Sequence, residues 1–245
     1  MKGIILAGGT GTRLKPLTTI INKHLLPVGP YPMIYWPIIK LKEAGITEIL
    51  LVINGADQEM FETLLGDGRN LGVNLSFAHQ KGPNGIADGI GSGRNFVGKK
   101  KFIVILGDNL FEDSLVSYIE SFRLQEKGAK VLLKQVDDPQ RYGIAELDTE
   151  KKIITSIEEK PIHPKSNLCA VGIYMYDSSV FEYIDSTVPS GRGELEITDV
   201  NNMYIKNDQL SYDFLNGWWI DAGTHKSLYT ANSFYYCNNR EGNNE

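Results

Sequence analysis

Short apolar runs alternate with amphipathic segments along the first half of the 245-residue chain. Such runs are typical of strands that are buried on both faces of a parallel sheet. They predict strands at residues 4–7, 48–53, 75–79, 102–106 and 129–136. Apolar residues at helical spacing predict helices between them, at residues 33–44, 58–65 and 115–127. The alternation predicts an α/β fold with a doubly wound, mainly parallel sheet.

The pattern changes after about residue 137. Strand-like segments separated by turns follow at residues 142–147, 153–158 and 168–176, which favours an antiparallel insertion. Helical spacing returns at residues 196–206 and 225–237. The sequence shows no internal repeat and no proline-rich linker, so we expect one domain over residues 1–245, with halves at 1–136 and 137–237. The polar tail, residues 238–245, is expected to be frayed.

Composition narrows the class of protein. Hydrophobic residues make up 42% of the chain and charged residues 22%, as in ordinary soluble globular proteins. The net charge of −5 argues against nucleic acid as a partner. The sequence has no signal peptide and no apolar run of membrane-spanning length, so we expect no membrane association and a cytoplasmic location. Cys169 and Cys237 have no metal-ligand spacing and form no disulfide framework.

A glycine-rich turn, Gly-Gly-Thr-Gly-Thr at residues 8–12, follows the first predicted strand. Its lack of bulky side chains lets phosphate oxygens approach the backbone N–H groups. Arg13 follows the turn directly and Lys23 comes ten residues later, so two cations can fold over an anion. This arrangement indicates a nucleoside triphosphate site. Glycines alone leave an ordinary strand-to-helix turn equally possible.

Three other phosphate motifs do not fit. Residues 9–14 lack the third glycine of the dinucleotide fingerprint. Residues 93–100 nearly match a P-loop, but Lys100 replaces the hydroxyl residue and a strand follows the segment, so we interpret it as a basic turn. The strand and loop motifs that accompany a kinase glycine loop are absent.

Residues 8–18, Gly-Gly-Thr-Gly-Thr-Arg-Leu-Lys-Pro-Leu-Thr, together with residues 23–28, Lys-His-Leu-Leu-Pro-Val, resemble the signature of the sugar nucleotidyltransferases. Within that family the chain is most similar to the glucose-1-phosphate thymidylyltransferases of the dTDP-rhamnose route, and the match recurs along nearly the whole chain. The resemblance implies a Rossmann-like nucleotidyltransferase fold with a sugar-binding antiparallel insertion. It also implies Mg²⁺-dependent transfer of a nucleotidyl group from dTTP to α-D-glucose 1-phosphate, which gives dTDP-glucose and pyrophosphate.

Two alternatives stay open. One is a uridylyltransferase that makes a UDP-sugar, because thymine and uracil share the edge that a glutamine reads. The other is a non-catalytic sensor that binds sugar nucleotides. The presence of Arg13, Lys23, Asp108 and Asp221 together argues against the sensor.

Gln80 closes the third predicted strand. Its carboxamide offers a donor and an acceptor, which match the N3–H and O4 edge of thymine, although an isolated glutamine is more often solvated. The resemblance implies catalytic roles for Arg13, Lys23 and Asp108. It implies a nucleotide site made of Leu6, Gly8, Gly9, Gly11, Thr12, Arg13, Lys23, Gln80, Pro83, Gly85 and Asp108.

Asp108 lies in Leu-Gly-Asp-Asn, just past the buried strand at residues 102–106. Mg²⁺ prefers one or two carboxylates together with phosphate oxygens and water, although an aspartate in a turn often only bonds its own backbone. The resemblance pairs Asp108 with Asp221 on one magnesium ion. The alternative role of Asp221 is to cap a helix.

Residues 158–161, Glu-Glu-Lys-Pro, follow a predicted strand. Carboxylates suit sugar hydroxyls and lysine suits a phosphate, although the segment could also be a solvated charge run. The resemblance makes Glu159 the sugar ligand and Lys160 the phosphate ligand, with Arg192 able to reach the same phosphate. The implied sugar-phosphate site is Asn109, Gly143, Glu158, Glu159, Lys160, Ala170, Gly172, Tyr174 and Arg192.

The chain departs from the family pattern near the nucleotide. His24 stands where many thymidylyltransferases have glutamine, and Asp88-Gly89 replaces small and amide residues. Long family members continue by about fifty residues into a segment that forms a second nucleotide site, a normal size for an extension. Because this chain ends at Glu245, we expect a short form that its product inhibits only at the active site. We also expect a homo-oligomer, formed through aromatic residues 234–236.

Overall fold

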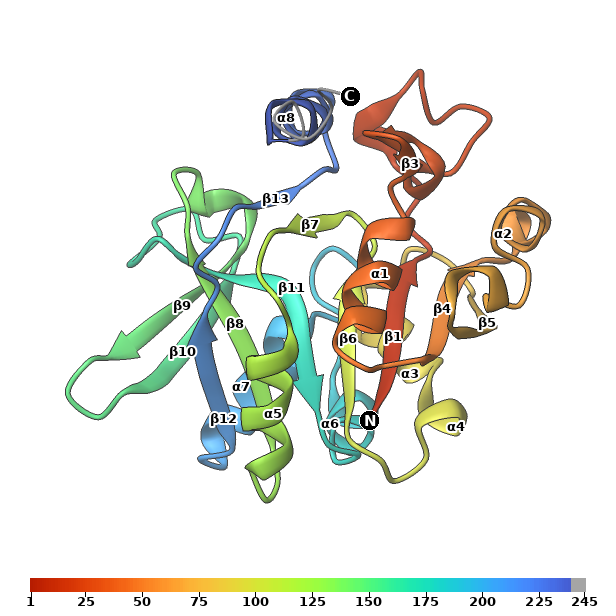
Figure 1. Cartoon of the computed structure of the whole chain (residues 1–245). Coiled ribbons are helices and arrows are strands. Elements are labelled where there is room, and N and C mark those ends of the chain that lie inside the picture. The colour runs from red at the N-terminus through yellow and green to blue at the C-terminus, as the bar shows by residue number, and fades with distance from the viewer. Residues whose placement is uncertain (239–245) are drawn as a thin grey trace.

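The computed structural model describes residues 1–238, and its central element is a nine-stranded sheet (Figure 1). The strand order is β10-β9-β11-β6-β1-β4-β5, and β8 pairs with both β11 and β12. The strands are β1 (Lys2–Ala7), β4 (Glu48–Asn54), β5 (Asn74–Gln80), β6 (Phe102–Leu106), β8 (Ala129–Gln135), β9 (Gly143–Asp148), β10 (Ile153–Glu159), β11 (Leu168–Tyr176) and β12 (Leu210–Phe214).

Strands β6, β1, β4 and β5 pair in parallel, with Ile4 opposite Leu50 on one side and Val104 on the other. The side chains of β1, β4 and β6 are mostly buried on both faces, which explains their continuous apolar runs. The predicted parallel centre is confirmed. Strand β11 runs antiparallel to β6, β8 and β9, so the antiparallel strands continue the central sheet. Strand β12 was not predicted, because its polar and apolar residues are only half buried.

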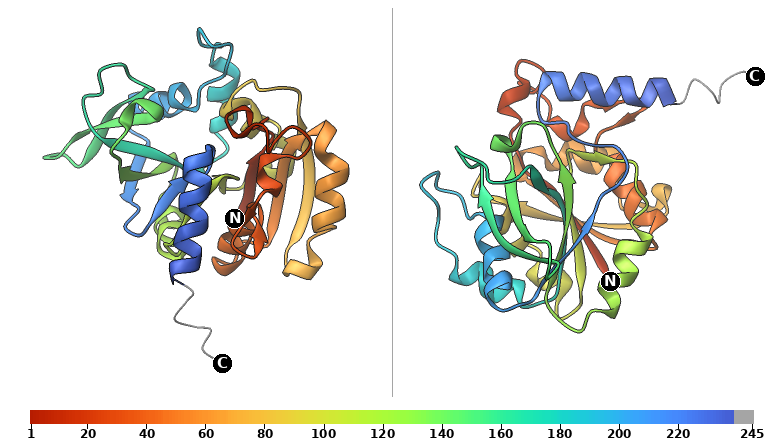
Figure 2. Two further views of the ribbon diagram at one scale, coloured as in Figure 1. Left: turned by 90° about the horizontal axis from the view of Figure 1, so that it is seen from above. Right: turned by 90° about the vertical axis from the view of Figure 1, so that its left-hand side faces the viewer.

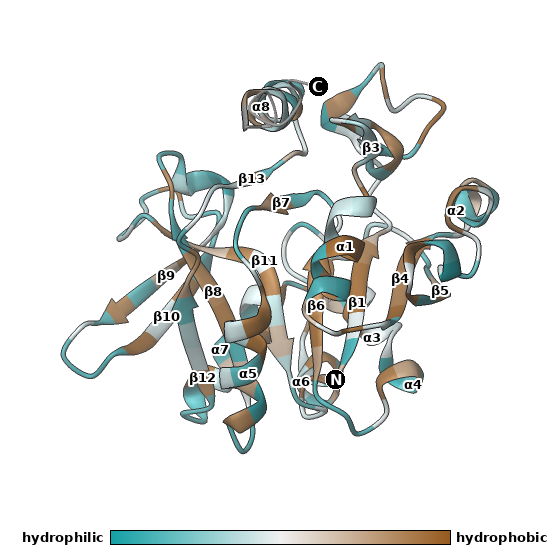
Figure 3. Cartoon of the chain, in the orientation of Figure 1, coloured by the Kyte–Doolittle hydropathy of each residue, from teal (hydrophilic) through white to brown (hydrophobic). Residues whose placement is uncertain are grey.

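Helices cover both faces of the sheet. On one face, α1 (Tyr35–Glu43), α2 (Gln58–Leu65) and α5 (Val116–Leu124) contribute Ile38, Phe61 and Ile119 to one core. On the other, a second core receives most of its helical side chains from three further helices. These are α3 (Ile86–Gly91), α6 (Val180–Ser186) and α7 (Ile197–Lys206). Figure 3 shows the apolar strands between these layers. Two layers of helices on one sheet confirm the doubly wound α/β fold.

Shorter elements surround this sheet. Within residues 93–100, predicted as a turn, Arg94–Val97 forms the short helix α4. The 3-10 helices are η1 (Thr12–Leu14), η2 (Lys23–Leu25), η3 (Gly55–Asp57), η4 (Arg69–Leu71) and η5 (Pro139–Arg141). Two antiparallel ribbons join β2 (Pro27–Val28) to β3 (Tyr31–Pro32) and β7 (Asn109–Phe111) to β13 (Trp219–Asp221).

Helix α8 (His225–Asn238) packs against the β2–β3 ribbon. Asn232 accepts a hydrogen bond from the backbone N–H of Gly29 at 3.0 Å and donates one to the carbonyl of Pro27 at 3.2 Å. Seen from above, α8 lies between the first and second halves of the chain (Figure 2). The end of the described chain is therefore tied to the segment that follows the glycine turn.

Two predictions concern the ends and the surroundings of the chain. The frayed tail was placed at residues 238–245, of which 239–245 lie outside the described residues and residue 238 ends α8. None of the helices in the described part of the chain has both the length and the apolar character of a membrane span.

Candidate active site

A cavity of about 580 Å³ lies at the carboxyl ends of the central strands. Ligands of doubly wound sheets bind at this edge, where β1 runs into the glycine turn, β5 ends at Gln80 and β6 leads to Asp108. The predicted site residues that line it are Leu6, Gly8, Gly9, Arg13, Lys23, Gln80, Pro83, Gly85, Asp108, Asn109, Gly143, Glu159, Lys160, Ala170, Gly172, Tyr174, Arg192 and Asp221.

Three predicted site residues do not line this cavity. Gly11 has a left-handed φ of 63°, and its carbonyl accepts a hydrogen bond from the hydroxyl of Thr18. Thr12 is exposed in η1. Glu158 is exposed on the opposite face of β10 from Ile157 and Glu159, because neighbouring side chains of a strand alternate between faces. The cavity geometry gives no support to the predicted sugar contact of Glu158.

The glycine turn forms one wall. A Cβ atom on Gly8 would lie 3.0 Å from Oε1 of Gln80, and one on Gly9 would lie 3.3 Å from Cε of Lys23. Gln80 donates through Nε2 to the carbonyl of Gly85 at 2.8 Å, which leaves its Oε1 as the acceptor near the turn. Small residues at 8 and 9 thus let the amide of Gln80 and the charge of Lys23 approach the turn closely.

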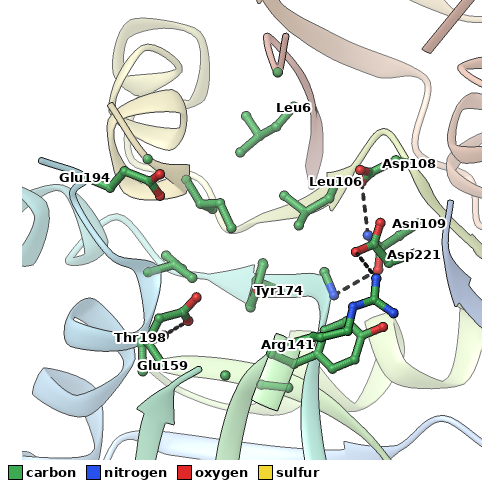
Figure 4. Close-up of a pocket in the computed structure, with 18 of the residues that line it drawn as sticks. Leu6, Leu106, Asp108, Asn109, Arg141, Glu159, Tyr174, Glu194, Thr198 and Asp221 are labelled. Carbon is green, nitrogen blue, oxygen red and sulfur yellow. Dashed lines mark hydrogen bonds and ion pairs between the residues drawn. The ribbon is translucent and has the colours of Figure 1, made fainter. Parts of the chain in front are cut away.

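The β7–β13 ribbon brings two distant carboxylates together. The backbone N–H of Ala222 donates to the carbonyl of Asp108 at 2.9 Å. A Cβ atom on Gly223 would lie 2.7 Å from Oδ1 of Asp221 and 3.4 Å from Oδ2 of Asp108, so both carboxylates face the same small space. Figure 4 shows them together at one end of the cavity, with Arg141 beside them. Lys23 forms an ion pair with Asp108.

The two carboxylates have opposite pKa shifts. Burial raises the pKa of Asp221, and the negative charge of Asp108 raises it further. Burial is the largest single influence on the pKa of Asp108 and favours a raised value, but the charge of Lys23 and the hydrogen bonds from Lys23 and Asn109 act together with smaller contributions to hold that pKa well below its usual range. Lys23 therefore offsets only part of the negative charge in this space.

This donor set fits a hard divalent cation. Two adjacent, partly desolvated carboxylates attract such an ion. Residues 1–238 contain no cluster of three or more His, Cys, Asp or Glu side chains that could hold a metal, so any ion here needs further oxygens from substrate and water. That requirement matches sites in which a metal ion is shared between carboxylates and substrate phosphates.

Arg141 is a cavity residue that the sequence did not single out. It donates through Nη1 to Asp138 at 2.7 Å, and its Nη2 lies 3.9 Å from Oδ2 of Asp221. Among the described residues, this Nη2 is the one buried side-chain nitrogen or oxygen without a hydrogen-bond partner. A buried donor of this kind is costly unless a ligand satisfies it. Its only sequence signal is its position two residues before Gly143.

The other end of the cavity is built around Glu159. Thr198, which was not predicted, donates to its Oε2 at 2.7 Å, while Lys160 and Arg192 lie 3.2 Å and 3.4 Å from its Oε1. A Cβ atom on Gly143 would lie 3.3 Å from both Glu159 and Thr198. The end opposite Asp108 therefore combines one acceptor with two cations, which suits a hydroxylated ligand that carries a phosphate.

His24 is buried beneath the paired Lys23 and Asp108. Only 1% of it is exposed, and its Nδ1 lies 2.8 Å from Oδ1 of Asn22. Burial, helped by the charge of Lys23, lowers its pKa to about 3. The folded protein therefore keeps this imidazole neutral.

This burial predicts a pH-dependent stability. Below pH 6.5 the unfolded chain protonates His24 and the folded chain does not, so stability falls as the pH falls. Below pH 6, we expect each unit of falling pH to lower the free energy of unfolding more in the wild type than in His24→Gln. The expected difference between the two proteins is about 1.4 kcal/mol per pH unit. Denaturant unfolding of both proteins at pH 7, 6 and 5 measures the difference. Parallel pH profiles would contradict it.

A family model described as nucleotidyl transferase matches residues 2–237. A glucose-1-phosphate thymidylyltransferase of Xanthomonas campestris pv. campestris (strain B100) is 46% identical over 236 residues, which are 95% of this chain and 80% of that protein. The protein of that name from Neisseria meningitidis serogroup A is 44% identical, over 96% of this chain and 82% of its own length.

Solved structures agree with these relatives. A Bacillus anthracis structure, provisionally described as a glucose-1-phosphate thymidylyltransferase and solved with a sucrose, is 51% identical. It has a TM-score of 0.91 and covers 96% of this chain and 94% of its own. A UDP-glucose pyrophosphorylase complexed with UDP-glucose is 26% identical, with a TM-score of 0.85, and covers 97% of this chain and 98% of its own. Because the family model and the thymidylyltransferase relatives span nearly the whole chain, the protein belongs to the nucleotidyl transferase family.

Proposed function

We propose that this protein transfers a thymidylyl group from dTTP to α-D-glucose 1-phosphate, which gives dTDP-glucose and pyrophosphate. The observation that carries the proposal is a single cavity with a glycine turn and two cations at one end, paired carboxylates beside them, and Glu159 with two cations at the other end. The names of the relatives support the choice of substrates. The two ends suit a triphosphate and a sugar phosphate respectively.

The reaction is an in-line displacement. An oxygen of the sugar phosphate forms a bond to the α-phosphorus of dTTP, the bond from that phosphorus to the oxygen that bridges it to the β-phosphate breaks, and pyrophosphate leaves with the electron pair. The attacking oxygen is already an anion, so no general base is needed. Catalysis then depends on positioning the two substrates and on neutralising charge at the transferred phosphate.

Several side chains are placed for this task. The N–H groups of the glycine turn and Arg13 would hold the triphosphate, and Lys23 would face the charge that develops at the α-phosphate. Arg141 would satisfy its buried Nη2 with a phosphate oxygen. The carboxylates of Asp108 and Asp221 would hold Mg²⁺, a divalent ion of the kind that nucleotidyltransferases generally use, and its charge would further stabilise the α-phosphate region.

The base subsite predicts a modest preference for dTTP over UTP. Oε1 of Gln80 can accept from N3–H of either base, and the two bases differ only by one methyl group. A methyl group in an apolar pocket is worth about tenfold, and Leu6 supplies an apolar contact in this cavity. We therefore expect kcat/KM to be about tenfold higher with dTTP. Pyrophosphate release is measured for each nucleotide with several hexose 1-phosphates and Mg²⁺.

The same assay separates the alternatives. A higher kcat/KM with UTP would make the protein a uridylyltransferase. The likeness of the chain to a UDP-glucose pyrophosphorylase supports that alternative hypothesis. Binding of dTDP-glucose without pyrophosphate release from any pair of substrates would make it a sensor.

Two further parts of the proposal concern organisation. We assign residues 1–136 mainly to the nucleotide and residues 137–237 mainly to the sugar phosphate, and we expect a cytoplasmic homo-oligomer. The aromatic surface predicted at residues 234–236 is partly internal, because the ring of Phe234 stacks on Trp218 with centroids 4.0 Å apart. The exposed Tyr229 and Tyr236 remain available on α8 for contact with another subunit.

A further inference from the structure

The loop before α7 carries Arg192, which lines the sugar end of the cavity. We propose that Glu196 is a positioning residue that fixes the guanidinium of Arg192 for the phosphate of the sugar substrate. The proposal rests on the proposed function, because it assumes that a sugar phosphate binds at this end. It assigns a task to a carboxylate that is not itself among the cavity-lining residues.

Glu196 holds the guanidinium through more than one hydrogen bond. Nη2 of Arg192 donates to both carboxylate oxygens at 2.8 Å, and Nε donates to Oε1 at 3.2 Å. The side chain of Glu196 is 10% exposed, whereas that of Arg192 is 40% exposed. A charge-assisted contact with a buried carboxylate restricts the orientation of an otherwise mobile side chain.

The carboxylate is itself fixed from two sides. The hydroxyl of Ser190 donates to Oε1 of Glu196 at 2.7 Å. The preceding residue, Leu195, donates its backbone N–H to the carbonyl of Asn84 at 2.7 Å and accepts from the N–H of Ala87 at 3.3 Å. The backbone beside Glu196 is thus fixed to the loop that follows Gln80, at the end of the cavity proposed to bind the nucleobase. Because Glu196 holds Arg192, this contact also limits the movement of Arg192.

Gly85 is what allows the two loops to meet. Its φ of 101° lies in the left-handed region, and a Cβ atom there would overlap the carbonyl oxygen of Leu195. The contact between the loops is therefore a backbone contact that needs this glycine.

The geometry leaves a donor for the substrate. Among the described residues, every hydrogen bond of the Arg192 guanidinium uses Nε or Nη2, the weakest being that from Nη2 to Glu159 at 3.4 Å. Nη1 can therefore donate to a phosphate oxygen while Nε and Nη2 stay hydrogen-bonded to Glu196. The opposing idea is that Glu196 occupies the place of the phosphate and must be displaced. The two ideas predict KM changes of opposite sign when the charge of Glu196 is removed.

The test is Glu196→Gln, which keeps the volume of the side chain and removes its charge. We expect KM for glucose 1-phosphate to rise about tenfold, the usual size of effect for losing a hydrogen bond to a charged group. KM for dTTP should change by less than about twofold, and kcat by less than about threefold, since the contact acts in the ground state and the transition state alike. A general loss of structure would instead lower the active fraction of the enzyme, and with it the apparent kcat, without a selective rise in one KM. An unchanged or lowered KM for glucose 1-phosphate would overturn the proposal.

Two further variants make the result specific. Glu194→Gln removes the same charge from a more exposed carboxylate 3.5 Å from Arg192, and we expect a clearly smaller rise in KM. In an Arg192→Ala background, Glu196→Gln should add less than about twofold, because a residue that acts only through Arg192 has no effect once that side chain is gone. A full tenfold effect in that background would overturn the proposal. Inactivity of the wild type with both substrates would instead refute the proposed function.

Discussion

Replacing Asp108 by asparagine should lower kcat for pyrophosphate release by about a thousandfold or more. The substitution removes one of the two adjacent carboxylates at the β7–β13 ribbon and weakens the attraction of that space for a divalent cation. Positive charge held beside the transferred phosphate matters most in the transition state, so kcat and kcat/KM should fall together. Steady-state rates over a range of Mg²⁺ concentrations measure the effect.

The result needs controls for folding, because Asp108→Asn also leaves the mostly buried Lys23 without its ion pair. Asp221→Asn keeps that pair and should cause a comparable loss. Asp67→Asn removes the same charge from a side chain that is 61% exposed, and should leave the rate unchanged. Thermal unfolding shows whether each variant is folded. Near-normal turnover of both Asp108→Asn and Asp221→Asn would refute the proposal that these two carboxylates hold the metal ion.

The second large effect is expected for Lys23→Ala, which should lower kcat by about a hundredfold to a thousandfold. Lys23 lies beside Gly9 and pairs with Asp108, so its ammonium group is held where the triphosphate would pass the glycine turn. Losing one preorganised donor to a developing negative charge typically costs this much in rate. Single-turnover rates at saturating dTTP separate this loss from weaker nucleotide binding.

Lys15→Ala is the matched control, because Lys15 is exposed on the same loop. We expect that variant to keep its rate within about twofold. If Lys23→Ala raised KM for dTTP without lowering kcat, Lys23 would serve ground-state binding alone.

Much of the fold could be predicted because its central strands are buried on both faces. Their continuous apolar runs leave little choice of structure. Short elements such as α3 and β12 were missed, because glycines interrupt one and mixed polar and half-buried residues make up the other. In such segments, tertiary contacts decide the structure more than local pattern does.

The candidate site, like the fold, could be predicted from the sequence only in part. Motifs placed most of the predicted residues on one cavity and singled out Glu159 as the sugar ligand, but they also assigned its neighbour Glu158 to the sugar-phosphate site. Only the strand alternation that buries Ile157 decides which of the two carboxylates faces the cavity. Arg141 could not be found from sequence, because its significance comes from Asp221, which lies far along the chain and reaches it only through folding.

The pairing of β7 with β13 also affects when the protein becomes active during its own synthesis. Chains emerge from the ribosome N-terminus first, so the glycine turn and Asp108 are exposed long before residue 221. The parallel strands β1, β4, β5 and β6 can associate during that interval, but the second carboxylate arrives only when β13 docks on β7. A chain that has not yet reached residue 221 therefore has the glycine turn without the second carboxylate, and on the proposed mechanism it would not yet turn over dTTP.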